Sequence, residues 1–434
     1  MSGHYKTYDP DQLFLLPPSL KEWLPEGHLA YFVSDVVDEL DLGEIEKTFS
    51  TRLQGQPPYH PALMVKLLFY AYCKGIPSSR KIENNTYEDI AFRILAAGHY
   101  PDHDTIADFR KTHLGALKGL FLQILLLCKE AKLVKLGHVA LDGTKMKANA
   151  SKHKAMSYGR MHEKEKELEH EVEALLRKAE SVDAEEDQRY GKGIRGDELP
   201  EELQFREKRL AKIREAKKAL EERVAQEAEP SQKEKQPKPK DQINFTDPES
   251  RIMKNSSTKE FMQGYNAQAA VDASSQVIVA AEVTIQSNDK KQLEPMLAEL
   301  KENCNALPKE LSADAGYYSE DNVAHVQAKG IRPLITPGNT RHNDAKPAPP
   351  RGRIPKQLSI KERMERLLRT RKGRKAYAKR KETVEPVFGQ IKGVRGFRQF
   401  LLRGLDSVKA EWQLICLTHN LLKLHRWRLA QTTA

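Results

Sequence analysis

The sequence predicts a mixed α/β (α+β) fold, in which helices cover a central sheet and an all-helical domain precedes it. Three observations predict this class. Residues 28–132 show only helical periodicity, and strand-like apolar runs recur between residues 136 and 335 with helical patterns among them. A long charged helical stretch separates the first run from the others, so the sheet domain is expected to contain an inserted helical hairpin.

Composition narrows the class of partner. The 434 residues carry a net charge of +11, which favours a polyanion, and nucleic acid before a membrane. A generally basic protein without such a partner has the same total, so the distribution of charge has to decide. The four cysteines are far apart and form no CxxC pair, which argues against a disulfide scaffold or a zinc site. No signal peptide or membrane-spanning run is recognisable, so a cytoplasmic protein without membrane contact is expected.

Residues 1–132 are expected to form a domain of short helices. Pro61 suits the first position of a helix, and Ser78 or Ser79 suits an N-cap. The expected helices cover residues 30–40, 62–73, a segment that starts at 77–81, 87–97 and 105–127.

Basic residues lie near the junctions of these helices, among them Arg80, Lys81 and Arg110. Short helices with cations at their ends suit DNA binding. Solvated charges on an ordinary helical domain give the same pattern, so both interpretations remain open at this point. Asp102 and His103 are expected to cap or turn the chain rather than bind a metal, because no further ligand lies near them.

The run 136–141 is short and largely apolar, as in a strand buried on both faces, and it ends at Asp142-Gly143. Open α/β sheets place ligands at the carboxyl ends of their strands, so Asp142 is a candidate ligand-binding residue. A single acid of this kind is more often a turn residue, and Asp142 alone favours that interpretation. The first part of the sheet domain is expected over residues 133–154.

Residues 155–245 are expected to be an insertion, with an antiparallel helical hairpin at about 158–228 and a flexible linker at 229–242. Leu210, Ile213 and Leu220 follow a near-heptad spacing, and a glycine-rich stretch separates the two helices. The surface charges are mixed, so a solvated hairpin is the default interpretation. Contact with DNA or with a second copy is the alternative.

The sheet domain is expected to resume over residues 246–434. Two strand-like runs joined by a tight turn predict a β-hairpin, and shorter strands then alternate with helices. Pro386 is expected to kink or restart the last helix. The expected strands cover 265–271, 276–284, 310–314 and 331–335, and the expected helices 292–303, 319–328 and 375–392. This order is compatible with a ribonuclease-H-like fold.

A second strand therefore ends on an acid, Asp314, and the last of these helices carries Glu385. Two-metal phosphoryl transfer needs hard oxygen ligands for two Mg²⁺ ions, and three carboxylates from separate elements can supply them. Asp142, Asp314 and Glu385 are the candidate catalytic and metal-binding residues. The nearby alternatives are Asp272 and Asp289, which lie in turns, and Glu382, which lies one helical turn before Glu385.

Basic residues are dense between Arg351 and Lys381, and only Glu362 and Glu365 oppose them. A solvated run normally mixes the signs of charge more evenly, so a phosphate-binding stripe is favoured over a solvated surface. The stripe leads into the helix of Glu385, where the substrate backbone has to be held if Glu385 binds a metal. Its candidate DNA-binding residues include Arg374, Lys375, Arg380 and Lys381.

The N-terminal region contains Tyr59-His60-Pro61 and the stretches 75–83, 101–106 and 109–110, and the catalytic region contains 141–145, 264–268, 313–317, 385–392 and 400–404. With these motifs in this order, the chain resembles the DDE transposases of prokaryotic insertion sequences. The group it resembles has an N-terminal helical transposase domain and a ribonuclease-H-like catalytic domain. The resemblance covers nearly the whole chain, and the ordered set is specific where no single piece is.

The resemblance implies that Asp142, Asp314 and Glu385 are the metal-binding triad, with two Mg²⁺ ions as cofactor and Mn²⁺ as a substitute. It also implies partners: terminal inverted repeats, target DNA, and further copies of the chain in a dimer or larger synaptic complex. A prokaryotic, nucleoid-associated protein is expected.

Related families carry a Tyr–Arg–Glu–Lys signature on the last helix. Glu385 and Lys392 keep the spacing of that signature. Tyr377 lies one residue nearer the N-terminus than expected, and Lys381 stands where Arg is usual. Lys392 is therefore a better candidate than Tyr377 or Lys381 for holding the DNA end.

The function implied by the resemblance is cleavage of DNA at the ends of an insertion sequence and transfer of the freed strand to target DNA. Two other classes remain open. One is a ribonuclease-H-like nuclease that cuts but does not join. The other is a non-catalytic DNA-binding protein derived from a transposase, which would not bind Mg²⁺ at the triad.

Overall fold

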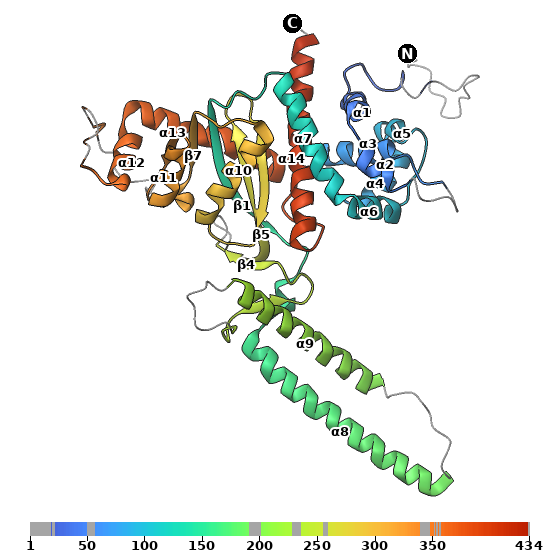
Figure 1. Cartoon of the computed structure of the whole chain (residues 1–434). Helices are drawn as coiled ribbons and strands as arrows, with labels where there is room; N and C mark the ends of the chain where they lie inside the picture. Colours follow the sequence, from blue (N-terminus) through green and yellow to red (C-terminus); the bar gives the residue numbers. More distant parts are fainter. Residues whose placement is uncertain are drawn as a thin grey trace, which may run out of the picture.

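The computed structural model describes residues 22–49, 57–190, 201–227, 236–254, 259–338 and 357–432, together with Ser19, residues 348–350, Gly352 and Pro355. The glycine-rich stretch 191–196, part of the expected linker and the first cations of the basic stripe lie outside these residues. A helical region and a mixed sheet flank the long helix α14 (Leu405–Thr432), and a helical hairpin projects from the sheet (Figure 1). The predicted mixed α/β class is confirmed.

The N-terminal region is helical, as expected, and its apolar faces are buried. In α1 the buried residues include Phe32, Val33, Val36 and Val37, which recur at the spacing of one helix face. The helices are α1 (Leu29–Glu39), α2 (Gly43–Lys47), α3 (Pro61–Cys73), α4 (Ser79–Glu88), α5 (Ile90–Leu95), α6 (His103–Thr112) and α7 (Leu114–Glu130).

Two of the expected helices have different bounds. The Asp89 carboxylate caps α5, so this helix starts later than expected and Tyr87 belongs to α4. The helix expected over 105–127 was wrong: the backbone leaves the helical conformation at His113, and α6 meets α7 at 71°. Asp102 caps α6 through its side chain, as its expected turn role requires.

The sheet has the order β6-β5-β1-β7-β8, with β4 beside β6 on the outer edge of β5. β1 pairs antiparallel with β5 and parallel with β7, and β7 pairs parallel with β8. This mixed sheet agrees with the predicted ribonuclease-H-like layout. The strands are β1 (His138–Lys147), β4 (Arg251–Lys254), β5 (Phe261–Asp272), β6 (Ile278–Thr284), β7 (Glu310–Ala313) and β8 (Arg332–Ile335).

The two faces of the sheet have different covers. Leu141 and its partner Ala270 lie together with apolar residues of α10 (Leu293–Cys304), so they face this helix. Asp142 is hydrogen bonded to Arg380 of α13 (Arg371–Gly389). Because successive strand residues point to opposite faces, α10 and α13 lie on opposite sides of the sheet. α11 (Glu320–Ala328) packs beside β8.

β1 does not end at Asp142, which corrects the expectation from the sequence. The strand continues to Lys147, because β5 pairs with it along its whole polar second half, up to Lys147 opposite Gly264. What ends at this point is the parallel pairing with β7, whose last pair is Leu141 with Ala313. Asp142 therefore lies at the carboxyl end of the parallel part of the sheet.

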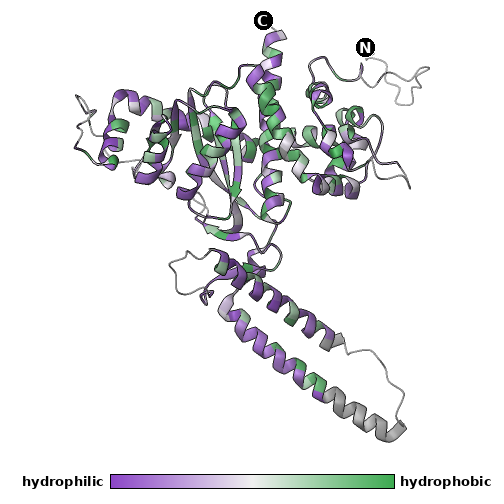
Figure 2. Cartoon of the chain, viewed as in Figure 1, coloured by the Kyte–Doolittle hydropathy of each residue, from purple (hydrophilic) through white to green (hydrophobic). Residues whose placement is uncertain are grey.

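The insertion forms the predicted antiparallel hairpin of α8 (Tyr158–Tyr190) and α9 (Glu201–Glu227). Met161, Leu168, Leu210, Ile213 and Leu220 bury one another in a cluster separate from the main core. The hairpin is closed at its base by the short strands β2 (Ala155–Ser157) and β3 (Gln242–Asn244), which pair with each other. Figure 2 shows hydrophilic residues over most of this arm and hydrophobic residues gathered in the body of the molecule.

The C-terminal part contains one helix that was not predicted, α12 (Ile360–Arg369), inside the basic stripe. α13 then runs through Pro386 without a break and continues as the π-helical turn Gln390–Val394. α14 packs against α3, α7 and β6, and the buried residues of the helical region and the sheet form one continuous core.

Among the described residues, no single helix is both long and apolar enough to cross a membrane. By length and composition alone, one bent pair, α6 with α7, passes the same test.

Candidate active site

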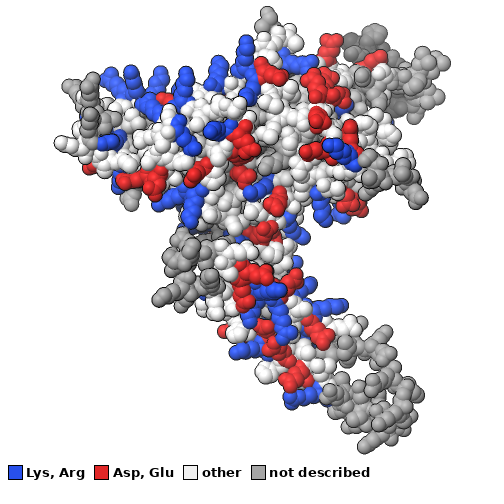
Figure 3. Space-filling view, in the orientation of Figure 1, with Lys and Arg blue, Asp and Glu red and all other residues white. Residues whose placement is uncertain are grey.

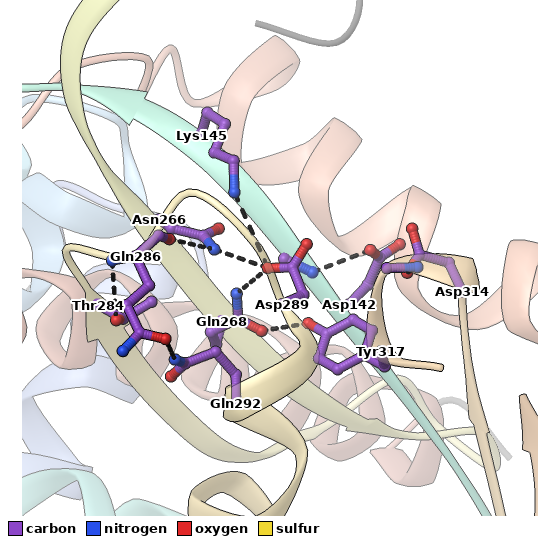
Figure 4. A network of polar contacts seen from close by, with 12 residues as sticks. Asp142, Lys145, Asn266, Gln268, Thr284, Gln286, Asp289, Gln292, Asp314 and Tyr317 are labelled. Atoms are coloured by element: carbon purple, nitrogen blue, oxygen red, sulfur yellow. Dashed lines mark hydrogen bonds and ion pairs between the residues drawn. The ribbon is translucent and has the colours of Figure 1, made fainter. Parts of the chain in front are cut away.

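The structure brings two of the three predicted acids together. Asp142 and Asp314 each directly follow the last parallel pair of β1 and β7, Leu141 with Ala313, so they are neighbours on adjacent strands. Figure 4 shows their carboxylates next to one another. Asp314 also caps the short 3-10 turn Ala315–Tyr317 by accepting a hydrogen bond from the Gly316 N–H at 2.8 Å.

Burial and neighbouring negative charges oppose the ionisation of both carboxyl groups. Burial raises the pKa of Asp142 to about 6; the charges of Asp314 and Asp289 also raise it, and Arg380 lowers it. Burial likewise raises the pKa of Asp314, with a further rise from Asp289. A bound cation would offset the repulsion between two adjacent carboxylates and favour their ionised forms.

The positive charge of Arg380 lies between the carboxylates of Asp142 and Glu385. Its Nη1 donates to Asp142 Oδ2 at 2.7 Å, and its Nη2 lies 3.9 Å from Glu385 Oε1. The guanidinium lies over the Tyr377 ring at 5.9 Å, and its Nε is buried with no hydrogen-bond partner among the described residues. The third predicted acid, Glu385, is thus on the same side of the sheet as Asp142 but is separated from it by Arg380, and its side chain is 55% exposed.

Asp289 belongs to the site more closely than its turn position suggested. Its Oδ1 accepts hydrogen bonds from Asn266 Nδ2 at 2.6 Å and Gln268 Nε2 at 2.8 Å, and Lys145 Nζ lies 3.8 Å away (Figure 4). A Cβ at Gly143 would lie 2.9 Å from Asp289 Oδ1, so this glycine gives the carboxylate its space. The sequence feature that could have pointed to this site is the pair of polar residues Asn266 and Gln268 at alternate positions of a buried strand, because buried polar side chains need hydrogen-bond partners.

Asp272 and Glu382, the other alternative acids, lie away from Asp142 and Asp314. Asp272 is buried and accepts hydrogen bonds from the backbone of Lys135, Leu136 and Ser274, which is the structural role expected of it. Glu382 is exposed and lines a cavity of about 530 Å³ at the other end of β1.

Lys392 is placed beside Asp142 on the same strand face. Its Nζ donates to Thr144 Oγ1 and to the Lys145 carbonyl, the latter at 2.7 Å. Thr144 is two residues after Asp142, so its side chain lies about 7 Å along the same face. Burial lowers the pKa of Lys392 to about 8, with smaller contributions from Arg398 and Lys145. An ammonium has three donors, and one of them remains for a ligand.

The basic stripe is an exposed surface. Arg374, Lys375 and Lys381 are exposed on α13, and Figure 3 shows a row of Lys and Arg side chains along the edge formed by α12 and α13. Arg80 and Lys81 are exposed at the start of α4.

Arg110 does not fit the expectation of DNA contact. It is only 6% exposed, and its Nη1 donates to the Tyr72 hydroxyl at 3.0 Å and to the Pro77 carbonyl at 2.7 Å. A guanidinium enclosed in this way holds α3 and the start of α4 together and has no open side for a phosphate.

The donor set fits divalent metals in its chemistry, because Mg²⁺ prefers carboxylate oxygens. Its geometry is incomplete: in the part of the chain that the structure describes, no three His, Cys, Asp or Glu side chains are grouped closely enough to hold a metal ion. Arg380 lies between two of the predicted acids, hydrogen bonded to Asp142 Oδ2 and 3.9 Å from Glu385 Oε1. Asp142 and Asp314 thus have the ligand chemistry of a metal site, and the Arg380 guanidinium lies against the Asp142 oxygen that a cation would approach.

The fold and the acids define a ribonuclease-H-like protein with a carboxylate site at the end of its parallel strands. Two family models match the chain, one described as Transposase domain (DUF772) over residues 18–112 and one as Transposase DDE domain over residues 228–421. The searches of curated proteins and of solved structures found no match. The chain belongs to the DDE transposases of insertion sequences, a family of DNA-processing enzymes.

Proposed function

We propose that this transposase cleaves DNA at the ends of its element in a Mg²⁺-dependent reaction and transfers the freed strand to target DNA. The single observation that carries the chemistry is the adjacency of Asp142 and Asp314 at the end of the β1–β7 ladder. The two transposase families support the class of reaction. Terminal inverted repeats are the proposed substrate, bound by a dimer or larger complex of the chain.

Asp142, Asp314 and Glu385 would hold two Mg²⁺ ions, or Mn²⁺ in their place. When bound, such ions polarise the phosphate and strengthen the attacking oxygen nucleophile. Cation binding would require Arg380 to move away from Asp142 Oδ2, because the guanidinium charge 2.7 Å from this oxygen repels a cation bound there. The freed guanidinium then suits a phosphate oxygen of the DNA.

The other residues position the DNA and the acids. Lys392 fixes β1 just beyond Asp142 and offers its remaining donor to the DNA end. Tyr377 supports the Arg380 guanidinium with its ring. Arg374, Lys375 and Lys381 on α13 would bind the DNA backbone, and Arg80 and Lys81 on α4 are proposed to contact DNA from the helical region.

Amide substitutions test this proposal, because they keep the shape of each side chain and remove its charge. Asp142→Asn, Asp314→Asn and Glu385→Gln are each expected to reduce Mg²⁺-dependent cleavage of an inverted-repeat duplex by roughly 10³-fold or more. Binding of the same duplex, measured by fluorescence anisotropy, should remain. Glu382→Gln, one turn away on the same helix, is the matched control and should cleave normally.

Full cleavage by Asp142→Asn would sink the assignment of that acid. Cleavage by the unchanged protein without joining to target DNA would indicate a nuclease. Binding without any cleavage or Mg²⁺ uptake would indicate a non-catalytic DNA-binding protein.

A further inference from the structure

A second basic surface lies at the end of β1, beyond Asp142. There the end of β1 and the segment 398–403 run side by side: Lys147 N–H donates to the Arg398 carbonyl at 3.2 Å, and Phe400 N–H to the Lys147 carbonyl at 2.9 Å. Asn149 Nδ2 continues the contact by donating to the Leu401 carbonyl at 2.7 Å. We call its exposed cations the distal basic surface: Lys147, Lys152, Lys154, Arg398 and Arg403.

These cations have no carboxylate partner among the described residues. Three acids beside the segment are already engaged. Asp247 is buried and accepts a hydrogen bond from the Tyr265 hydroxyl at 2.8 Å, and Glu249 accepts the Leu405 N–H at 2.7 Å. Glu411 is buried and accepts the N–H groups of Leu401 and Leu402. Five like charges gathered without counter-charges repel one another, and a bound polyanion relieves that repulsion.

Arg398 and Arg403 are held in place for such a ligand. The Nε of Arg398 donates to the Lys392 carbonyl at 3.1 Å, and the Nε of Arg403 donates to the Asn149 carbonyl at 3.0 Å. Each anchor leaves both Nη groups of an exposed side chain available. A guanidinium fixed in this way loses less conformational entropy when it binds a phosphate oxygen.

The strand sets the distance of this surface from the acids. Lys147 is five residues after Asp142 on β1, which is about 17 Å at the ordinary rise of a strand. That span equals the rise of roughly five base pairs of duplex DNA. Val394, 83% exposed between Lys392 and Arg398, adds an aliphatic side chain suited to a sugar or base edge.

We propose that the distal basic surface binds phosphates of the DNA duplex about half a helical turn from the cleaved bond. The inference rests on the proposed function, since it places the same DNA substrate. It gives the DNA two lines of backbone contact, the α12–α13 stripe and the distal basic surface.

The test is the salt dependence of binding. With an inverted-repeat duplex of about 40 base pairs, each lost phosphate contact lowers the slope of log affinity against log salt by about 0.9. Arg398→Gln/Arg403→Gln should therefore lower the slope by about 2 and weaken binding at least tenfold at low salt. Two trimmed duplexes, each ending at the cleavage site but extending from it in opposite directions, locate the contact. The difference in slope between the variant and the unchanged protein should vanish on one of them, the duplex that lacks the side bound by the distal basic surface.

Lys301→Gln/Lys329→Gln removes the same charge from exposed positions on α10 and after α11, and should leave the slope unchanged. Lys152→Gln/Lys154→Gln, at exposed positions, repeats the test if loss of the arginine anchors unfolds the protein. An unchanged slope in folded variants, or an equal loss on both trimmed duplexes, overturns the inference. Absence of DNA binding by the unchanged protein overturns the proposed function as well.

Discussion

At the scale of single residues, Asp142 is a largely buried carboxyl group whose negative charge is unfavourable in the metal-free protein but would favour metal binding. Its side chain is only 17% exposed and lies beside Asp314, and even the Arg380 contact at 2.7 Å does not bring its pKa back to the ordinary value. Such a residue reduces the stability of the metal-free protein. The proposed metal site explains why it is kept there.

Replacement of Asp142 by Asn should stabilise the metal-free protein at neutral and alkaline pH. The folded-state pKa of about 6 lies above the unfolded value of 3.8, so the folded protein takes up this proton first as pH falls. Ionisation costs folding free energy above pH 6, on the order of 2–3 kcal/mol, and that cost fades between pH 6 and pH 4. Urea unfolding of Asp142→Asn and the unchanged protein at pH 8 and pH 4 measures it. An Asn variant less stable at pH 8 would contradict this account.

Addition of Mg²⁺ provides the matching control. It should raise the melting temperature of the unchanged protein at pH 8, because a ligand that binds only the folded state stabilises it. The rise should be smaller in Asp142→Asn, which lacks one of the proposed ligands.

At the scale of elements, the strands and most helices followed from apolar periodicity, but polar segments did not. The second half of β1, from Gly143 to Lys147, has no apolar pattern, and it is a strand because β5 pairs with it. α12 was not predicted; Met364 is its only fully buried residue, and Ser359 and Glu362 form a capping box that marks its start. Asp142 and Asp314 could be predicted as neighbours because each follows a short apolar strand in the sequence. The position of Arg380 between Asp142 and Glu385 depends on tertiary packing and could not be predicted.

The contact between α3 and the end of the π-helical turn can be tested with two glycines. Gly75 and Gly98 both have φ near +75°, but a Cβ at Gly75 would overlap the Arg395 carbonyl, while Gly98 has open space. Gly98→Ala should cost about 1 kcal/mol for backbone strain, and Gly75→Ala at least 2 kcal/mol more. Thermal unfolding of both variants measures the difference, and equal costs would show that the Arg395 segment yields easily.

At the scale of the whole molecule, one core joins the helical region to the sheet, and the hairpin stands apart from it. α14 links the two parts: Trp412 Nε1 donates to the Gln268 carbonyl at 2.8 Å, and Asn420 Nδ2 to the Ile278 carbonyl at 2.8 Å. The hairpin has its own apolar cluster and is joined to the sheet domain through β2 and β3. The heptad spacing predicted this separation, because its apolar residues suffice only for the contact between two helices.

Removal of the hairpin should therefore leave the rest of the protein folded. Tyr158 N–H already donates to the Asp241 carbonyl at 2.8 Å, so a two-residue Asn-Gly turn can replace residues 159–240. The shortened protein is expected to unfold cooperatively within a few degrees of the full chain, by circular dichroism and calorimetry. Loss of cooperative unfolding would show that the hairpin supports the main core.

The central claim is that Asp142, Asp314 and Glu385 meet at a metal when DNA is bound. The most direct measurement is a crystal structure of the protein with its inverted-repeat DNA and Mn²⁺, in which anomalous scattering locates the ions. We expect Mn²⁺ in contact with Asp142 and Asp314, Glu385 drawn in beside them, and Arg380 moved from Asp142 to a DNA phosphate. Mn²⁺ bound elsewhere, or Arg380 still on Asp142 with the DNA in place, would contradict it.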